Sequence, residues 1–172
     1  MQNNIRFFTA TILKWQHLLK PDKYKQLIVD SLQFLVTDNR IWIYGFVVMP
    51  NHIHLLWRMK EGHEEENVRR DFLKFTAQQI KSDLILHHPA VLDRFKSTQS
   101  DRSYQFWERR PYSSTMVSRM AVEQKLDYMH NNPLQEKWKL VNLPEEYCFS
   151  SAKYYLFNDP LFSFITHYTE HI

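Results

Sequence analysis

Glycine is almost missing from this chain of 172 residues, which contains only Gly45 and Gly62. Loops that cradle nucleotide phosphates need several glycines close together, so a nucleotide-binding loop of that kind is excluded. The single cysteine, Cys148, cannot form a disulfide within the chain. No apolar run reaches membrane-spanning length, and Arg6 and Lys14 interrupt the region where a signal peptide needs its apolar core. We therefore expect a cytoplasmic protein with no membrane partner.

Apolar and aromatic residues are plentiful. They make up 44% and 15% of the chain, which is enough for a substantial core. We expect one domain over residues 1–172, with a core at about 1–135 and a C-terminal wrap at 136–172. The net charge is only +3, and nine lysines and arginines against six acids fall between Asp93 and Leu140. That excess suits a solvated surface as well as a nucleic-acid contact.

The order of apolar patterns predicts an α+β fold. Strands are expected at 6–15, 40–49, 52–59 and 103–117, and helices at 21–37, 67–86 and 118–132. Asn67 and Ser118 suit helix N-caps, and Pro133 ends the last helix. Pro111 favours an edge position for the fourth strand, because proline cannot donate to a ladder. The order is that of the ferredoxin-like (βαββαβ) fold, a four-stranded antiparallel sheet with helices on one face, followed by a further helix.

The third expected strand carries two histidines. Because strand side chains alternate between faces, His52 and His54 lie on one face and Ile53 on the other. Two imidazoles placed in this way can chelate one metal ion. An isolated pair of this kind is more often structural, either on a solvated face or bonded to the backbone of the core. Buried histidines, however, need polar partners, and apolar neighbours place this strand in the sheet interior.

A partner for the histidines lies in the last expected helix. Tyr128 and Asn132 are four residues apart and so share one helical face. Asn132 offers an amide oxygen to a ligand set, and the Tyr128 phenol can attack phosphorus. A plain structural interpretation serves equally well for the two residues alone, with Tyr128 in the core and Asn132 capping the helix.

Four segments in this order resemble the single-tyrosine HUH transposases of the IS200-like superfamily, and most closely the REP-associated tyrosine transposases. They are MPNHIHLLW (49–57), FWERRPY (106–112), KLDYMHNNPLQEKW (125–138) and PEEYCFSSAKYY (144–155). The resemblance spans nearly the whole chain. Met129 and Leu134 depart from the family's commoner aliphatic residues, which affects DNA sequence preference more than chemistry.

The resemblance implies a function. His52 and His54 match the family's metal-binding pair, Asn132 its third ligand, and Tyr128 its nucleophile. The implied cofactor is a divalent cation, Mg²⁺ or Mn²⁺. The implied activity is nicking and strand transfer of single-stranded, hairpin-forming DNA through a 5′-phosphotyrosine, in a bacterial cytoplasm. The family acts as monomers or homodimers.

Trp107, Arg109 and Arg110 are the residues that we expect to contact DNA, the arginines through its backbone. Two other functions stay open on the residues alone. A non-catalytic module for single-stranded nucleic acid can use a sheet of this topology to stack bases. A zinc hydrolase can use a His-x-His pair, although the sequence shows no further cluster of ligands.

Overall fold

The computed structural model describes residues 4–172. Its sheet has the strands β1 (Arg6–Thr11), β2 (Ile41–Val48), β3 (His52–Met59) and β4 (Tyr112–Thr115). All neighbouring strands are antiparallel, in the order β2-β3-β1-β4. The helices are α1 (Asp22–Thr37), α2 (Glu65–His87), α3 (Pro89–Asp93), α4 (Arg119–Asn131) and α5 (Ala152–Phe157). The α+β, ferredoxin-like prediction is confirmed.

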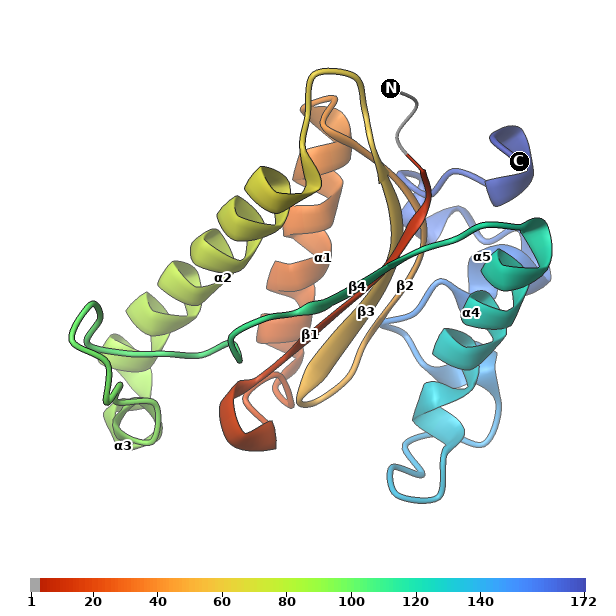
Figure 1. The fold of residues 1–172 in the computed structure, drawn as a ribbon. Coiled ribbons are helices and arrows are strands. Elements are labelled where there is room, and N and C mark those ends of the chain that lie inside the picture. The colour runs from red at the N-terminus through yellow and green to blue at the C-terminus, as the bar shows by residue number, and fades with distance from the viewer. Residues whose placement is uncertain (1–3) are drawn as a thin grey trace.

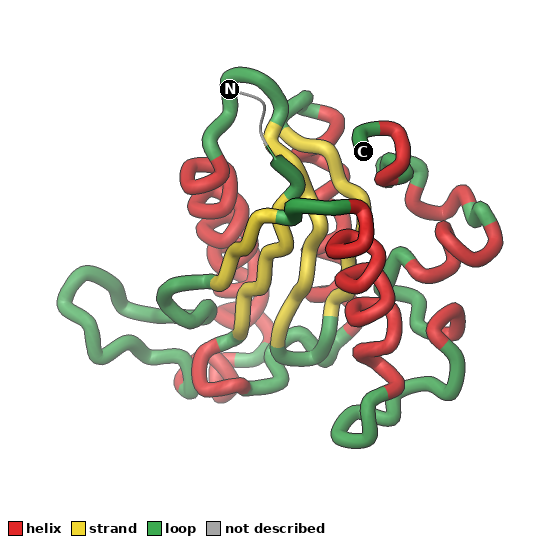
Figure 2. The backbone as a smooth tube through the Cα atoms, turned by 45° about the vertical axis from the view of Figure 1, so that its right-hand side comes forward, coloured by secondary structure: helices red, strands yellow, loops and turns green. Residues whose placement is uncertain are grey.

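The sheet separates two layers (Figure 1). Helices α1 and α2 cover one face, where alternate residues of the central strands join a large apolar cluster. Helix α4 and the C-terminal segments cover the other face over a smaller cluster. Figure 2 shows α4 on the near side of the strands, with the two long helices behind them. Strand β3 lies inside the sheet, between β2 and β1, so its two histidines are held between paired strands.

Helix α4 approaches the sheet closely because β2 has a glycine beneath it. A Cβ atom on Gly45 would lie 2.5 Å from Leu126 Cδ2 and 3.1 Å from Met129 Cε. The register of β2 against β3 shifts between Ile43 and Gly45, which marks a β-bulge. The missing side chain and the bulge together bring the α4 backbone near the strand that carries the histidines.

The segment after α4 runs along the outer strand of the sheet. Ser150 forms an antiparallel bridge with Val47, and Ile165 forms a parallel bridge with Ile43. The Tyr147 hydroxyl donates to the carbonyl of Val48 at 2.7 Å. Residues 136–172 therefore follow the β2 edge of the sheet: Tyr147 and Tyr168 join the cluster on the α4 side, whereas Phe164 and Ile165 join the cluster on the α1/α2 side.

Some predicted boundaries were wrong. The fourth strand is four residues long rather than spanning 103–117, because Arg110 has a φ of 61° and Pro111 has no N–H to donate. The first strand ends at Thr11, and Lys14 and Trp15 follow with φ of 54° and 57°. Helix α2 begins at Glu65, two residues before the expected cap. Among residues 4–172, no helix is long and apolar enough to span a membrane.

Candidate active site

The two histidines lie next to each other on the α4 side of the sheet. Their ring centroids are 4.7 Å apart, and the residues are 6% and 5% exposed. Ile53, between them, points into the cluster under α1 and α2. The strand alternation thus places both imidazoles on one face, as the sequence predicted.

A short relay of hydrogen bonds determines the tautomer of His52. The Asn51 amide nitrogen donates to the Trp15 carbonyl at 3.2 Å, so the Asn51 amide oxygen faces His52. That oxygen can only accept, so His52 Nδ1 donates to it at 2.7 Å. The lone pair of His52 is consequently on Nε2, the atom left to bind an external partner.

His54 is held from the neighbouring strand. Its Nδ1 lies 2.7 Å from the Thr9 hydroxyl, and its ring stacks on Phe7 at 5.2 Å between centroids. Thr9 is directly opposite His54 in the β1–β3 ladder. The other ring nitrogen, Nε2, is buried and has no hydrogen-bond partner among the described residues. An unsatisfied buried nitrogen of this kind is costly unless something binds it.

Helix α4 brings Tyr128 to the histidines. The helix starts as predicted, with the Ser118 hydroxyl accepting from Ala121 N at 3.1 Å. The Tyr128 ring centroid is 5.3 Å from that of His54 and 6.2 Å from that of Phe7. Tyr128 is 44% exposed, so its phenol is open to a substrate at the edge of a buried site.

Asn132 completes the cluster at the C-terminal end of α4. It is 2% exposed, and its side-chain oxygen has no hydrogen-bond partner among residues 4–172. Two unsatisfied atoms, one imidazole nitrogen and one amide oxygen, therefore belong to the same small site. A divalent cation bound at this site would accept both lone pairs.

The electrostatics of the site keep both imidazoles neutral. Burial lowers the pKa of His52 to about 4, with Lys137 adding to the effect and the Asn132 side chain opposing it. Burial, and then the charges of His52, Lys125 and Lys137, lower the pKa of His54 well below its usual range. Neutral imidazoles are the form that binds metal ions.

The donor set fits a divalent cation of intermediate hardness. Two imidazole nitrogens and an amide oxygen suit Mn²⁺ more than Mg²⁺, which prefers oxygen ligands. Residues 4–172 contain no group of three or more His, Cys, Asp or Glu residues arranged to bind a metal. A metal ion bound here would therefore take the amide of Asn132 as its third protein ligand.

The three residues expected to contact DNA lie elsewhere. Arg109 and Arg110 are exposed and line a groove against α2. Trp107 is 7% exposed, and its indole nitrogen donates to the Thr76 hydroxyl at 3.2 Å. Its side chain thus packs in the core beneath the arginines, and a contact between Trp107 and DNA stays a prediction that would require rearrangement.

Sequence reasoning missed several supporting residues. Thr9 and Asn51 orient the histidines, and Lys125 stands 4.5 Å from the Phe7 ring centre and 5.6 Å from that of Tyr128. Thr9 is far from His54 in sequence, so only the strand register reveals the contact. Asn51 precedes His52 directly, and an amide beside a candidate metal ligand was a usable signal.

Ser151, in the segment 144–155 that resembles the transposases, has a structural role that the sequence alone does not reveal. His130 Nε2 lies 2.8 Å from the Ser151 hydroxyl, which also accepts from the backbone N–H of Phe46 at 3.0 Å. Ser151 thereby ties α4 to β2. This contact sets the distance between β2 and the helix that carries Tyr128.

Known structures share this architecture. A REP-associated tyrosine transposase bound to a REP hairpin matches with a TM-score of 0.62 and 19% identity, over 88% of this chain and 78% of that one. The two chains have the same fold. A chain described as a candidate transposase from Deinococcus radiodurans R1 matches with a TM-score of 0.49 and 18% identity, over 76% of this chain and 92% of that one. This TM-score is too low to support an argument about fold or function. No protein-family model and no curated protein matches this sequence.

Proposed function

We propose that this protein nicks and rejoins single-stranded DNA next to a hairpin, using Tyr128 as the nucleophile. The observation that carries the proposal is the convergence of Tyr128, His52, His54 and Asn132 on one face, with two buried lone pairs unsatisfied. The sequence resemblance to REP-associated transposases and the shared fold point in the same direction. The neighbour was solved with a REP hairpin, which makes hairpin DNA the first substrate to test.

The chemistry is a transesterification that needs neither water nor ATP. The Tyr128 oxygen forms a bond to the scissile phosphorus, and the bond from phosphorus to the 3′ oxygen breaks. The phenol loses its proton, and the leaving 3′ oxygen gains one to become a free hydroxyl. The DNA phosphate is then linked through its 5′ side to the tyrosine. Attack by the same or another 3′ hydroxyl reverses the step and joins the strands.

Each residue of the site has a defined part in this reaction. His52, His54 and Asn132 would hold the divalent cation, which when bound supplies positive charge to the scissile phosphate. Thr9 and Asn51 hold the two imidazoles in fixed orientations. Lys125 places a further positive charge beside the Tyr128 ring, where an approaching phosphate is attracted.

The two alternative functions are less well supported. A module that stacks bases on an open sheet needs exposed aromatic residues on its central strands, but α4 covers that face and Phe7 of β1 is 3% exposed; the exposed Tyr112 belongs to the edge strand β4. A zinc hydrolase needs a third histidine, cysteine or carboxylate ligand, and the described residues contain no such group.

The decisive experiment is a denaturing gel of labelled hairpin DNA incubated with the protein and Mn²⁺. The parent chain should form a covalent protein–DNA adduct, and Tyr128→Phe should form none, because it lacks only the attacking oxygen. Tyr112→Phe is the matched control, since Tyr112 is also exposed and lies 6.5 Å from the same Phe7 ring. An adduct that persists in Tyr128→Phe would reject the mechanism.

The same gel tests whether one chain is sufficient to form a complete active site. Tyr128 lies beside the histidines of its own chain, so we propose that a monomer holds a complete site. Mixing Tyr128→Phe with His54→Ala should then restore no adduct. Recovered cleavage in the mixture would instead assign the tyrosine to a partner subunit in a homodimer.

A further inference from the structure

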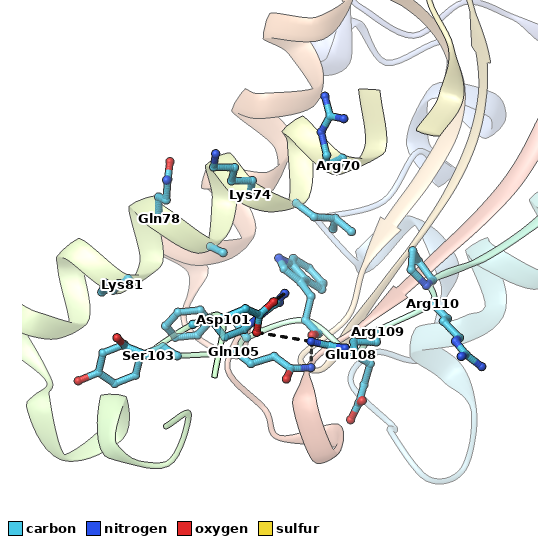
Figure 3. A pocket seen from close by; sticks show the side chains of 17 residues that line it. Arg70, Lys74, Gln78, Lys81, Asp101, Ser103, Gln105, Glu108, Arg109 and Arg110 are labelled. Atoms are coloured by element: carbon cyan, nitrogen blue, oxygen red, sulfur yellow. Dashed lines mark hydrogen bonds and ion pairs between the residues drawn. The ribbon is translucent and has the colours of Figure 1, made fainter. Parts of the chain in front are cut away.

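A groove of about 690 Å³ lies between α2 and residues 101–111, and the candidate active site does not use it. Figure 3 shows Arg70, Lys74, Gln78 and Lys81 along the α2 wall and Asp101, Gln105 and Arg109 on the facing segment. The groove lies against the helix layer, whereas the histidines are on the α4 side of the sheet.

Positive charge is concentrated in this groove. Its six cationic residues are Arg70, Lys74, Lys81, Arg102, Arg109 and Arg110, and its two acidic residues are Asp101 and Glu108. The cations exceed the acids by four, which is more than the net charge of +3 on the whole chain. The rest of the surface therefore carries no positive excess, and an anion is attracted to this place.

Much of this charge is available to a ligand. Asp101 serves two arginines, Arg102 at 2.8 Å and Arg109 at 3.6 Å, and cannot neutralise both. Lys74 and Arg110 are exposed and form no ion pair with any residue in the range 4–172.

The cations on α2 form a row. Arg70, Lys74 and Lys81 follow helical spacing and line the same groove over about 16 Å of helix axis. Phosphates repeat at about 3.4 Å along each strand of a duplex, so a row of this length faces several successive phosphates. The shape suits an extended polyanion better than one small anion.

One end of the groove leads to the candidate active site. Arg110 and Pro111 line the groove, and β4 begins at the next residue, Tyr112. Tyr112 pairs with Thr9, whose hydroxyl contacts His54. Strand β4 is the outer strand on this side, so a chain passing over it runs from the histidines into the groove.

We propose that this groove binds the phosphate backbone of DNA that flanks the scissile phosphate, with α2 as a DNA-contacting helix. The inference rests on the proposed function and extends the DNA contact from Arg109 and Arg110 to Lys74 and Lys81. The DNA passes over the β4 edge, with its reacting phosphate beside Tyr128. Contacts of this kind position the substrate and are independent of its sequence.

Fluorescence anisotropy with a labelled oligonucleotide tests the groove separately from cleavage. Binding is measured in the Tyr128→Phe background, so no covalent product forms. Adding Lys74→Ala and Lys81→Ala should weaken binding several-fold and reduce the slope of log affinity against log salt by one to two units. Lys20→Ala with Lys153→Ala, a pair outside the groove, should leave the slope unchanged. Lys74→Arg with Lys81→Arg, which keeps both positive charges, should bind as tightly as the parent chain.

Two DNA probes identify which part of the substrate occupies the groove. One is a hairpin with a single-stranded tail, and the other is an unstructured strand of equal length. A loss confined to the hairpin probe assigns the groove to the stem, and an equal loss on both assigns it to the single-stranded flank.

The outcomes separate the two proposals. If the slope of log affinity against log salt is the same in Lys74→Ala/Lys81→Ala as in the control pair, the proposal that the groove binds DNA is rejected, whatever the adduct gel shows. A reduced slope in a protein that forms no adduct supports the groove and rejects the nicking mechanism. Absence of DNA binding by the parent chain rejects both.

Discussion

The two faces of the sheet differ in whether their buried polar atoms form hydrogen bonds. Under α1 and α2, every buried polar side chain has a partner: Thr76 donates to the carbonyls of Phe72 and Leu73, and Ser31 donates to that of Leu27. Under α4, three buried atoms among the described residues have none, namely His54 Nε2, Asn132 Oδ1 and Trp138 Nε1.

This difference separates stability from function. The α1/α2 face combines the larger apolar cluster with satisfied hydrogen bonds. This face therefore stabilises the fold without any bound ligand. The α4 face carries unsatisfied groups that lower stability and are useful only when something binds them. A cost concentrated at one site is expected where a protein performs chemistry.

The largest effect should come from breaking the apolar face. Trp57 is fully buried and packs on Phe8 at 4.9 Å between ring centroids. Trp57→Ala should lower the free energy of unfolding by about 3–5 kcal/mol, because it leaves a cavity. Urea unfolding measures this, and exposed Trp15→Ala should change it by less than about 0.5 kcal/mol. A Trp57 effect no larger than the Trp15 effect would contradict the comparison.

Acid should act on the α4 face, which holds all three buried histidines of the described chain: His52, His54 and His130. Burial lowers the pKa of His130 from 6.5 to about 4. Between these values the unfolded chain binds a proton that the folded chain does not. The contribution of neutral His130 to the free energy of unfolding is therefore complete above pH 6.5 and is lost as the pH falls towards 4.

For His130 the expected loss between neutral pH and pH 5 is roughly 2 kcal/mol. Urea unfolding at pH 7.5 and pH 5 measures it. His130→Gln should reduce this pH dependence by about that amount. Equal pH dependence in the parent and His130→Gln would show that His130 is not the group that titrates.

A side chain at Gly45 should separate α4 from the sheet. Gly45→Ala places a methyl group against Leu126 and Met129, and we expect a loss of about 1–3 kcal/mol on unfolding. The rate of DNA cleavage should fall even under conditions in which the variant stays folded, because Tyr128 moves with the helix. Combining Gly45→Ala with Leu126→Val should cost less than the sum of the two single changes, and strict additivity would show that they do not collide.

The smallest stability effect should come from the site itself. His54→Phe keeps a ring against Phe7 and removes the unsatisfied nitrogen, while it leaves the Thr9 hydroxyl without its partner. These effects oppose each other, so stability should change by less than about 1 kcal/mol. Calorimetric titration should nevertheless show that Mn²⁺ binding is lost. Unchanged Mn²⁺ affinity would remove His54 from the ligand set.

Most of the fold could be predicted because its signals are local. Ser118 caps α4 as expected, and β2 and β3 match their predicted ranges within one residue at each end. The fourth strand was predicted too long because alternating aromatic residues imitate a strand. Phe106 and Trp107 are adjacent and both lie in the same core cluster, which is not the alternation of a regular strand, and the left-handed conformation of Arg110 breaks the pairing.

The sequence by itself determined the element order, the same-face placement of His52 and His54, and the one-turn spacing of Tyr128 and Asn132. Each follows from the periodicity of a strand or a helix. Only the tertiary structure decided that Thr9 contacts His54, that Gly45 admits α4, and that Lys74 and Arg110 line one groove. These contacts join residues far apart in the chain, and they depend on strand register and close packing, which local pattern does not encode.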